Sequence, residues 1–144
     1  MKLSTRGRYG LRLMLELAIH YKDRPILLKD ISENQRISLK YLGQLIMPLK
    51  IAGLVKSARG ARGGYSLSRP PEKIKIGEIV SALEGKLCIV ECIDNPEICE
   101  MSGKCAARDV WSELNHRMIE ILNSHTLQDM VTAQIQKENS MPLH

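Results

Sequence analysis

The sequence predicts a mostly α-helical fold with one small β-hairpin, and three observations support this prediction. The chain has 144 residues, a length that favours a single domain. Apolar residues recur at spacings of three and four along most of the sequence, as they do on one face of an α-helix. Only residues 54–67 combine two short β-prone runs with a glycine-rich turn.

The composition excludes several classes of protein. Apolar residues make up 44% of the chain, but no run approaches the roughly 18 apolar residues of a membrane helix. The first residues contain no apolar signal segment, so we expect a cytoplasmic protein that has no membrane partner. Phe is absent, and one Trp and four Tyr argue against surfaces that stack single-stranded bases.

The first helix is expected to begin after Ser4 or Thr5, since either residue can cap a helix N-terminus. Leu13 and Leu17 add a second apolar stripe, which predicts either a central core helix or a contact with a partner subunit. The main stripe has the spacing of an amphipathic helix and consists of Leu11, Met14, Leu15, Ala18 and Ile19.

Two helices separated by a polar turn are expected next. The first covers residues 28–33, after Pro25, and the second follows the capping residue Ser38 and ends at Gly53. This is the outline of a helix-turn-helix, although helix pairs of this kind occur in many proteins.

The following hairpin makes the interpretation more specific. Strands are predicted over residues 54–58 and 65–67, joined by a turn that contains Arg59 and Arg62. A helix-turn-helix followed by a hairpin with a basic tip is a winged helix. The second helix of its helix-turn-helix, the recognition helix, can enter the major groove of DNA. An ordinary mobile loop needs glycines but does not need two arginines, and the GKS or GKT ending of a phosphate-binding loop is absent.

The rest of the chain is expected to sense and to dimerise. A short helix over residues 76–84 ends at Gly85, and the aperiodic segment 86–104 contains the cysteines. A long helix from Cys105 to about Asn123 carries an apolar seam, for which we favour dimerisation over packing on its own domain. That seam consists of Val110, Trp111, Leu114, Met118, Ile121 and Leu122.

We therefore divide the chain into four parts. They are a winged-helix domain (1–85), a cysteine loop (86–104), a dimerisation helix with a C-terminal helix (105–136), and a flexible tail (137–144). Thr126 and Asp129 are expected to cap the C-terminal helix.

The charge is divided unevenly between the two halves of the chain. Residues 1–75 carry 16 basic and 5 acidic side chains, whereas residues 76–144 carry 5 basic and 11 acidic ones. This asymmetry indicates that the first half meets a polyanion and that the second half has a different task.

The four cysteines indicate a metal or cluster site. Cys88, Cys92, Cys99 and Cys105 are separated by three, six and five residues. Structural zinc usually takes paired cysteines two to four residues apart, which only Cys88 and Cys92 satisfy. The wider spacings suit an iron–sulfur cluster, and spacing alone leaves zinc open. Simple buried thiols fit the polar loop poorly.

The sequence resembles the IscR/NsrR-type iron–sulfur transcription regulators over residues 1 to about 131, and looks closer to the IscR branch. The matching segments are MKLSTRGRYG (1–10), ISLKYL (37–42), RGARGGY (59–65) and IGEIV (76–80), together with Cys92, Cys99 and Cys105. The resemblance implies a homodimeric winged-helix regulator with an iron–sulfur cluster, 2Fe–2S in the IscR branch, bound by these three cysteines.

The sequence departs from that family at the fourth ligand. The IscR branch has a His three residues after the last cysteine, where this chain has Arg108, a side chain without a lone pair for a metal. Some relatives use an acidic residue of the partner's first helix, and the matching position here is Arg8. Cys88 is the best unassigned thiol. The recognition helix also has Gly43 where the branch often has Glu.

We therefore expect a cytoplasmic regulator, not an enzyme, that binds a pseudo-palindromic double-stranded DNA operator and controls iron–sulfur cluster biogenesis or iron and redox genes. Gln44 is expected to contact adenine, and Lys40 guanine or phosphate. The full set of expected DNA-binding residues is Lys2, Arg6, Ser38, Lys40, Tyr41, Gln44, Arg59 and Arg62. The alternatives are a DNA-binding regulator with zinc or a thiol redox switch and, from another class, a cluster carrier or cysteine enzyme.

Overall fold

The structure is a computed structural model, and it describes residues 2–142. The elements in chain order are α1 (Thr5–Ile19), α2 (Leu28–Gln35), α3 (Leu39–Ile51), β1 (Val55–Ala58), β2 (Gly64–Leu67), the 3-10 turn η1 (Pro71–Lys73), α4 (Ile76–Glu84), α5 (Glu91–Asp94), the 3-10 turns η2 (Pro96–Ile98) and η3 (Ser102–Lys104), α6 (Ala106–Ser124) and α7 (Leu127–Ser140). The expected mostly α-helical fold with a single hairpin is therefore confirmed in this part of the chain.

Helix α1 lies at the centre of the core. Ser4 is its N-cap, because its hydroxyl accepts a hydrogen bond from the N–H of Gly7. The helix packs against α2, α3, α4, α7 and β2. Leu13 and Leu17, the second apolar stripe, are buried inside the chain. Of the two explanations for that stripe, core packing is the one observed.

The helix-turn-helix is closed by a tight turn between α2 and α3. Helix α2 continues to Gln35, two residues beyond its expected end, and Arg36 takes the left-handed conformation with φ 55°. Ser38 caps α3 and accepts a hydrogen bond from the N–H of Tyr41. The buried face of α3 packs on α1 and α4 and consists of Leu42, Leu45, Ile46 and Leu49.

The wing is an antiparallel pair of strands anchored by a third segment. Val55 lies opposite Leu67 and Ala58 opposite Gly64. Ile26 pairs with Tyr65 through two backbone hydrogen bonds of 2.9 and 2.8 Å. A Cβ atom at Gly64 would lie 2.4 Å from the carbonyl oxygen of Ile26, so this close approach requires glycine.

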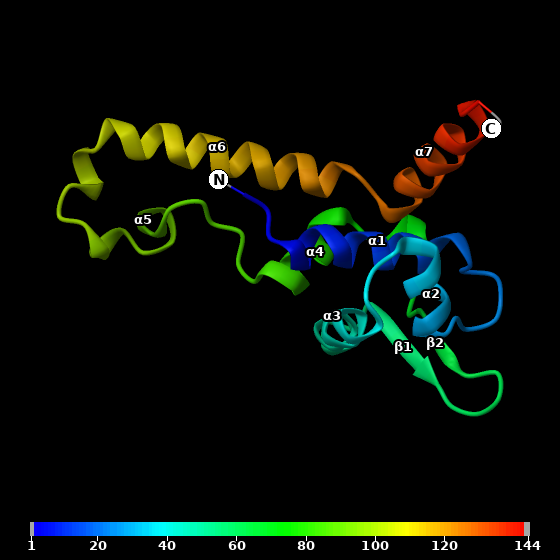
Figure 1. Ribbon diagram of the computed structural model, residues 1–144. Coiled ribbons are helices and arrows are strands. Elements are labelled where there is room, and N and C mark those ends of the chain that lie inside the picture. Colours follow the sequence, from blue (N-terminus) through cyan, green and yellow to red (C-terminus); the bar gives the residue numbers. More distant parts are fainter. Residues whose placement is uncertain (1, 143–144) are drawn as a thin grey trace.

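The second half of the chain forms a long extension (Figure 1). Helix α6 packs against α4 at its C-terminal end, while its N-terminal end and α5 project away from the wing. Two backbone hydrogen bonds fix the corner between α6 and α7. The N–H of Ile76 donates to the carbonyl of His125 at 2.9 Å, and the N–H of Leu127 donates to that of Ile74 at 2.8 Å.

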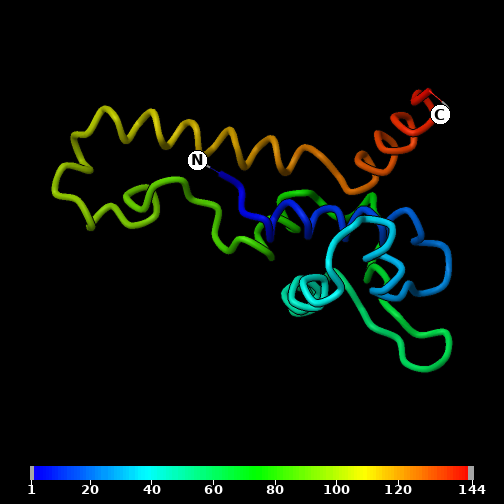
Figure 2. The backbone as a smooth tube through the Cα atoms, in the orientation of Figure 1, coloured from blue at the N-terminus to red at the C-terminus, as the bar shows by residue number. Residues whose placement is uncertain are grey.

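The cysteine loop is more ordered than its sequence suggests. It contains α5 and the two 3-10 turns η2 and η3, each only three or four residues long. Figure 2 shows that the chain runs outward from α4, turns at the tip, and returns as α6. We call residues 86–105 together with the first turn of α6 the cysteine arm.

The C-terminal helix differs from its expected boundary. Thr126 and Asp129 form the expected capping box, in which each side chain accepts a hydrogen bond from the other residue's backbone N–H. Helix α7 extends to Ser140, so residues 137–140 are helical instead of belonging to a tail, and residues 143–144 lie outside the described range. No helix in the described part of the chain is long and apolar enough to cross a membrane.

Candidate nucleic-acid interface and cysteine arm

The start of α3 presents the expected polar residues to solvent. Ser38, Lys40 and Gln44 are exposed, on the side of α3 opposite its buried apolar face. The Ser38 hydroxyl accepts the Tyr41 N–H at 3.2 Å, and its own proton can still be donated. The cap thus fixes the end of the helix that a winged helix presents to DNA.

Tyr41 differs from its neighbours because it is half-buried. Its hydroxyl lies 3.0 Å from the Thr5 hydroxyl, and its ring meets the ring of Tyr9 edge-on at 6.0 Å. The side chain therefore ties α3 to α1, and only its edge is available to a ligand. Because of this contact, the position of α3 depends on the start of α1.

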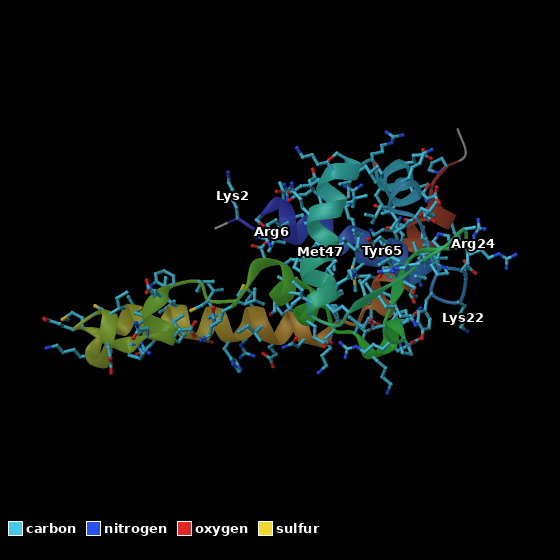
Figure 3. All side chains as sticks on the ribbon, turned by 90° about the horizontal axis from the view of Figure 1, so that it is seen from below. Lys2, Arg6, Lys22, Arg24, Met47 and Tyr65 are labelled. Atoms are coloured by element: carbon cyan, nitrogen blue, oxygen red, sulfur yellow. The ribbon has the colours of Figure 1, made fainter. Side chains whose placement is uncertain are left out.

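The expected phosphate-binding cations lie in the wing turn and at the start of α1. Arg59 and Arg62 are exposed in the turn between β1 and β2, and Lys2 and Arg6 are exposed at the start of α1. Viewed from below, Lys2 and Arg6 lie on one side of Met47 of α3 (Figure 3). Such a row of cations fits the phosphates that border a groove of duplex DNA.

Lys22 and Arg24 belong to the same surface, although the sequence reasoning missed them. They lie on the side of Met47 opposite Lys2 and Arg6 (Figure 3). Arg24 and Arg62 line one small cleft between the 24–27 segment and the wing. Only the pairing of Ile26 with β2 brings Arg24 there, so no local sequence pattern could have revealed its position.

A carboxylate holds the basic start of α1 in place. Glu84, at the end of α4, accepts hydrogen bonds from the Gly7 N–H at 3.0 Å and from the Ser4 hydroxyl. A carboxylate at a helix N-terminus also interacts favourably with the helix dipole. This contact positions Lys2 and Arg6 relative to α3 through α4, which packs on both helices.

The three expected cysteine ligands all lie on the cysteine arm. Cys92 is half-buried on α5, Cys99 is exposed after η2, and Cys105 is half-buried immediately before α6. Within residues 2–142, no three His, Cys, Asp or Glu side chains lie close enough together to hold a metal ion. The structure thus places the three thiols on one short segment but does not gather them around a point.

Cys88 has a different environment. Its thiol donates to the carbonyl of Val90 at 3.0 Å, and the carboxylate of Asp94 is also within its reach. Burial, followed by the contact with Asp94, raises the pKa of the Cys88 thiol. Because metals bind the thiolate, this environment disfavours Cys88 as a ligand.

Two side chains of the arm bear on the expected cluster. The Nε of Arg108 donates to the carbonyl of Cys92 at 3.0 Å, so this arginine fastens the loop to α6. The hydroxyl of Ser102 is buried and has no hydrogen-bond partner among the described residues. An orphaned hydroxyl between two cysteines suits a segment that receives a further acceptor, such as a cluster sulfur or a thiolate.

Comparisons with known proteins assign the family. The model of the Rrf2 family, described as iron-dependent transcriptional regulators, matches residues 3–133. The chain belongs to the Rrf2 family. It is therefore a DNA-binding transcription regulator, and the resemblance to IscR/NsrR-type regulators is confirmed.

Three relatives of this Rrf2-family chain are similar along most of their length. Protein rrf2 of Nitratidesulfovibrio vulgaris is 42% identical over 131 residues, which cover 91% of this chain and 87% of the relative. The regulator CymR of Bacillus subtilis is 42% identical over 132 residues, covering 92% and 91%. The regulator IscR of Vibrio parahaemolyticus is 39% identical over 132 residues, covering 92% and 78%. These relatives are regulators rather than enzymes.

Solved structures confirm the winged-helix fold expected for the Rrf2 family. CymR of B. subtilis, described as its global cysteine regulator, superposes with a TM-score of 0.79 at 41% identity and covers 92% of this chain and 98% of its own. IscR of T. potens superposes with a TM-score of 0.78 at 40% identity, covering 100% and 94%. The chain is thus similar to both CymR and IscR, and the fold alone does not show which of these two regulators it resembles in function.

Proposed function

We propose that this Rrf2-family protein is a homodimeric, cytoplasmic regulator that binds a pseudo-palindromic operator in response to an iron–sulfur cluster. The observation that carries this proposal is the placement of Cys92, Cys99 and Cys105 on one polar arm at the end of α6 remote from the wing. By its resemblance to the IscR branch, the cluster is 2Fe–2S, and the regulated genes concern cluster biogenesis, iron or redox balance.

The DNA-binding part of the proposal assigns a role to each exposed side chain. Gln44 pairs with an adenine and Lys40 with a guanine or a phosphate in the major groove. Arg59 and Arg62 of the wing contact phosphates or the minor groove, and Lys2 and Arg6 add phosphate contacts. Ser38 and the edge of Tyr41 contact the sugar-phosphate backbone of the DNA beside α3. All of these residues except the half-buried Tyr41 are exposed, which supports their assignment.

The proposed dimer uses the apolar side chains of α6 that its own chain leaves uncovered. Leu122 packs against the core, as the alternative explanation of the seam required. Val110, Trp111, Leu114 and Ile121 are instead 41–58% exposed. A row of exposed apolar side chains along a helix 19 residues long favours a second copy as partner. Two heads related by a two-fold axis then read half-sites about one helical turn apart.

The side chains of the arm are of the chemical types that bind an iron–sulfur cluster. Cysteine thiolates are the usual ligands of such a cluster, and the arm supplies three cysteines. Ser102 offers the cluster a hydroxyl that has no partner among the described residues. The fourth ligand stays open, because Arg108 has no lone pair to offer. When bound, such a cluster supplies a reversible link between three positions of the arm.

The proposed coupling between the cysteine arm and DNA binding rests on contacts within the chain. Arg108 joins the backbone at Cys92 to α6, and α6 is joined to the winged-helix domain through α4. A change in the arm can therefore alter the pose of α6 and of the two heads. The cluster shifts DNA affinity only through contacts that differ between the two states.

A binding assay tests the assignment of the wing. With a cognate duplex and fluorescence anisotropy, we expect Arg59→Ala to weaken binding by about 1–3 kcal/mol and to reduce the salt dependence of the affinity. Lys137→Ala, an exposed cation at the end of α7, is the matched control and should bind as the original chain does. Equal affinities of both variants would remove the wing from the interface.

Anaerobic purification tests the cluster. We expect a coloured protein whose visible and Mössbauer spectra show bound iron and sulfide, with loss of both in Cys99→Ala and retention in Cys88→Ala. Arg108→His should lengthen cluster retention if that position can supply the fourth ligand. A colourless protein with one tightly bound zinc per chain would refute the cluster.

A second candidate is a regulator that uses a thiol switch or zinc in the same arm. It is favoured by the exposure of the Cys99 thiol and by the similarity to CymR of Staphylococcus aureus, solved in an oxidized form with 38% identity and a TM-score of 0.74. Its distinguishing result is an oxidant-dependent change in DNA affinity, with a mass change at Cys99, in protein that contains no iron.

A further inference from the structure

A large apolar side chain stands in the middle of the DNA-facing surface. Met47 of α3 is 54% exposed, although the other face of the same helix is fully buried. Lone exposed apolar residues are common on protein surfaces and need no explanation by themselves. Met47 differs because Lys2 and Arg6 lie on one side of it and Lys22 and Arg24 on the other (Figure 3).

The helix geometry places Met47 beside the residues expected to read bases. At 100° per residue, Lys40, Gln44 and Met47 fall within an arc of about 60° on α3. Gly43, one turn before Met47, has an ordinary φ, and a Cβ atom there would meet nothing within 4 Å. No side chain at position 43 therefore separates Met47 from a ligand that approaches this face.

The surrounding charge indicates which ligand covers this surface. A rim of cations from α1, the 22–24 segment and the wing matches a polyanion, not an apolar protein partner. In the major groove, the apolar group that a base pair presents is the C5-methyl group of thymine. A flexible thioether side chain adapts readily to such a contact.

We propose that Met47 reads a thymine methyl group in each half-site, one turn of α3 beyond the base contacted by Gln44. The inference rests on the proposed operator binding by α3 and deepens it. It predicts a T·A pair at a fixed distance from the base pair that Gln44 reads. Neither charge nor hydrogen bonding contributes to this preference for thymine. The affinity difference between thymine and other bases at this position should therefore depend little on salt.

The test removes the methyl group and nothing else. A cognate duplex is first selected from random sequences with the full chain, and each thymine is then replaced in turn by deoxyuridine. We expect one position in each half-site at which the original chain loses about fourfold in affinity, the worth of one buried methyl group. In Met47→Ala, this loss should disappear, because the variant no longer contacts the methyl.

Ile51→Ala is the matched control. Ile51 is 83% exposed on the same side of α3 but lies at its last position, one further turn from the end that enters the groove. It should keep the full deoxyuridine effect. Each comparison is made within one variant, so a change in folding cancels.

The outcomes separate this inference from the proposed function. Met47 is not a reader if Met47→Ala keeps the deoxyuridine effect, if Ile51→Ala loses it instead, or if no thymine matters to the original chain. In those cases operator binding stands. If no duplex is selected, the proposed operator binding fails and the inference fails with it.

Discussion

Glu16 shows how a single buried charge can hold the helix-turn-helix together. It lies on α1 with only 5% of its surface exposed, and it accepts hydrogen bonds from the amides of Asn34 and Gln35, each at 2.7 Å. Arg12 in turn donates to the Gln35 side chain at 3.1 Å. The carboxylate thereby joins α1 to the end of α2, directly before the turn that leads to α3.

Replacing this carboxylate should therefore destabilise the protein. We expect Glu16→Gln to lower the free energy of unfolding by about 1–3 kcal/mol, because the new side chain has one acceptor oxygen and leaves one of the two amide donors without a partner. Urea denaturation followed by circular dichroism measures it. Glu33→Gln, at an exposed position of α2, should change stability by less than about 0.5 kcal/mol. Similar losses in both variants would argue against this role of Glu16.

Replacement by alanine should have opposite effects at two glycines, Gly43 and Gly64. Gly43→Ala should stabilise the protein by about 0.5–1 kcal/mol, because its Cβ meets open space and alanine favours the helix. Gly64→Ala should destabilise it by about 1–3 kcal/mol, because φ is 138° there and the Cβ would collide with the carbonyl of Ile26. Thermal unfolding measures both, and stabilisation by Gly64→Ala would contradict the observed wing anchor.

At the scale of elements, α4 is held at its N-terminus by a single carboxylate, that of Glu78. Glu78 accepts a hydrogen bond from the Lys75 N–H at 2.9 Å and forms an ion pair with Arg69 at 2.5 Å. Burial raises the pKa of Glu78, but these hydrogen bonds and the nearby positive charges outweigh it, so the pKa lies below its usual value.

This lowered pKa gives a pH-dependent contribution to stability. A carboxyl group with a lowered pKa in the folded state stabilises it above the unfolded pKa, and the benefit is lost as the pH falls through the folded value. We expect Glu78→Gln to be less stable than the original chain at pH 7, with a smaller difference at pH 3 than at pH 7. Urea titrations at both pH values test this, with the exposed Glu72→Gln as control. A pH-independent difference would exclude the ionised pair as its cause.

Elements with local capping signals were predictable, and those that depend on tertiary contacts were not. Ser38 and Thr126 cap their helices as expected, since a cap needs only a side chain and the next three residues. The short helices of the arm are too short to show a periodic pattern. The anchoring of the wing by Ile26 and the fastening of the arm by Arg108 join residues far apart in sequence, so no local pattern shows them.

At the scale of the whole molecule, the two oppositely charged halves of the sequence occupy different places. The basic half forms the helix-turn-helix and wing, and most of the acidic half forms the arm, α6 and α7 (Figure 1). The acidic arm therefore projects away from the surface that we propose meets DNA. The winged-helix fold and this polarity were predictable from the sequence, whereas the separation of the three thiols depends on the path of the arm.

The proposed dimer gives a prediction at this scale. Val110→Glu and Ile121→Glu place charges on the exposed face of α6 and should convert the protein to monomers in analytical ultracentrifugation. Operator affinity should fall at least tenfold, because the two heads no longer bind as a unit. Trp111, the single tryptophan, should become more solvent-exposed and shift its emission to the red.

The control for this prediction is Leu27→Glu. Leu27 is 52% exposed but lies next to the wing, on another side of the molecule. It should sediment as the original chain does. Dissociation by this variant as well, or a monomeric original chain, would contradict a dimer held by α6.

The fixed corner at the C-terminal end of α6 has a mechanical consequence. Two hydrogen bonds hold this corner to Ile74, just before α4, and to Ile76 at its start, while the opposite end of the helix adjoins the cysteine arm. A helix of 19 residues is about 28 Å long, so a tilt of about 5° at the corner moves the far end by about 2.4 Å. Conversely, a displacement of that size at the thiols would correspond to a rotation of a few degrees at the corner between α6 and α7. In the proposed regulator, helix α6 would therefore convert a small translation of the arm tip into a change of angle between the two halves of the molecule.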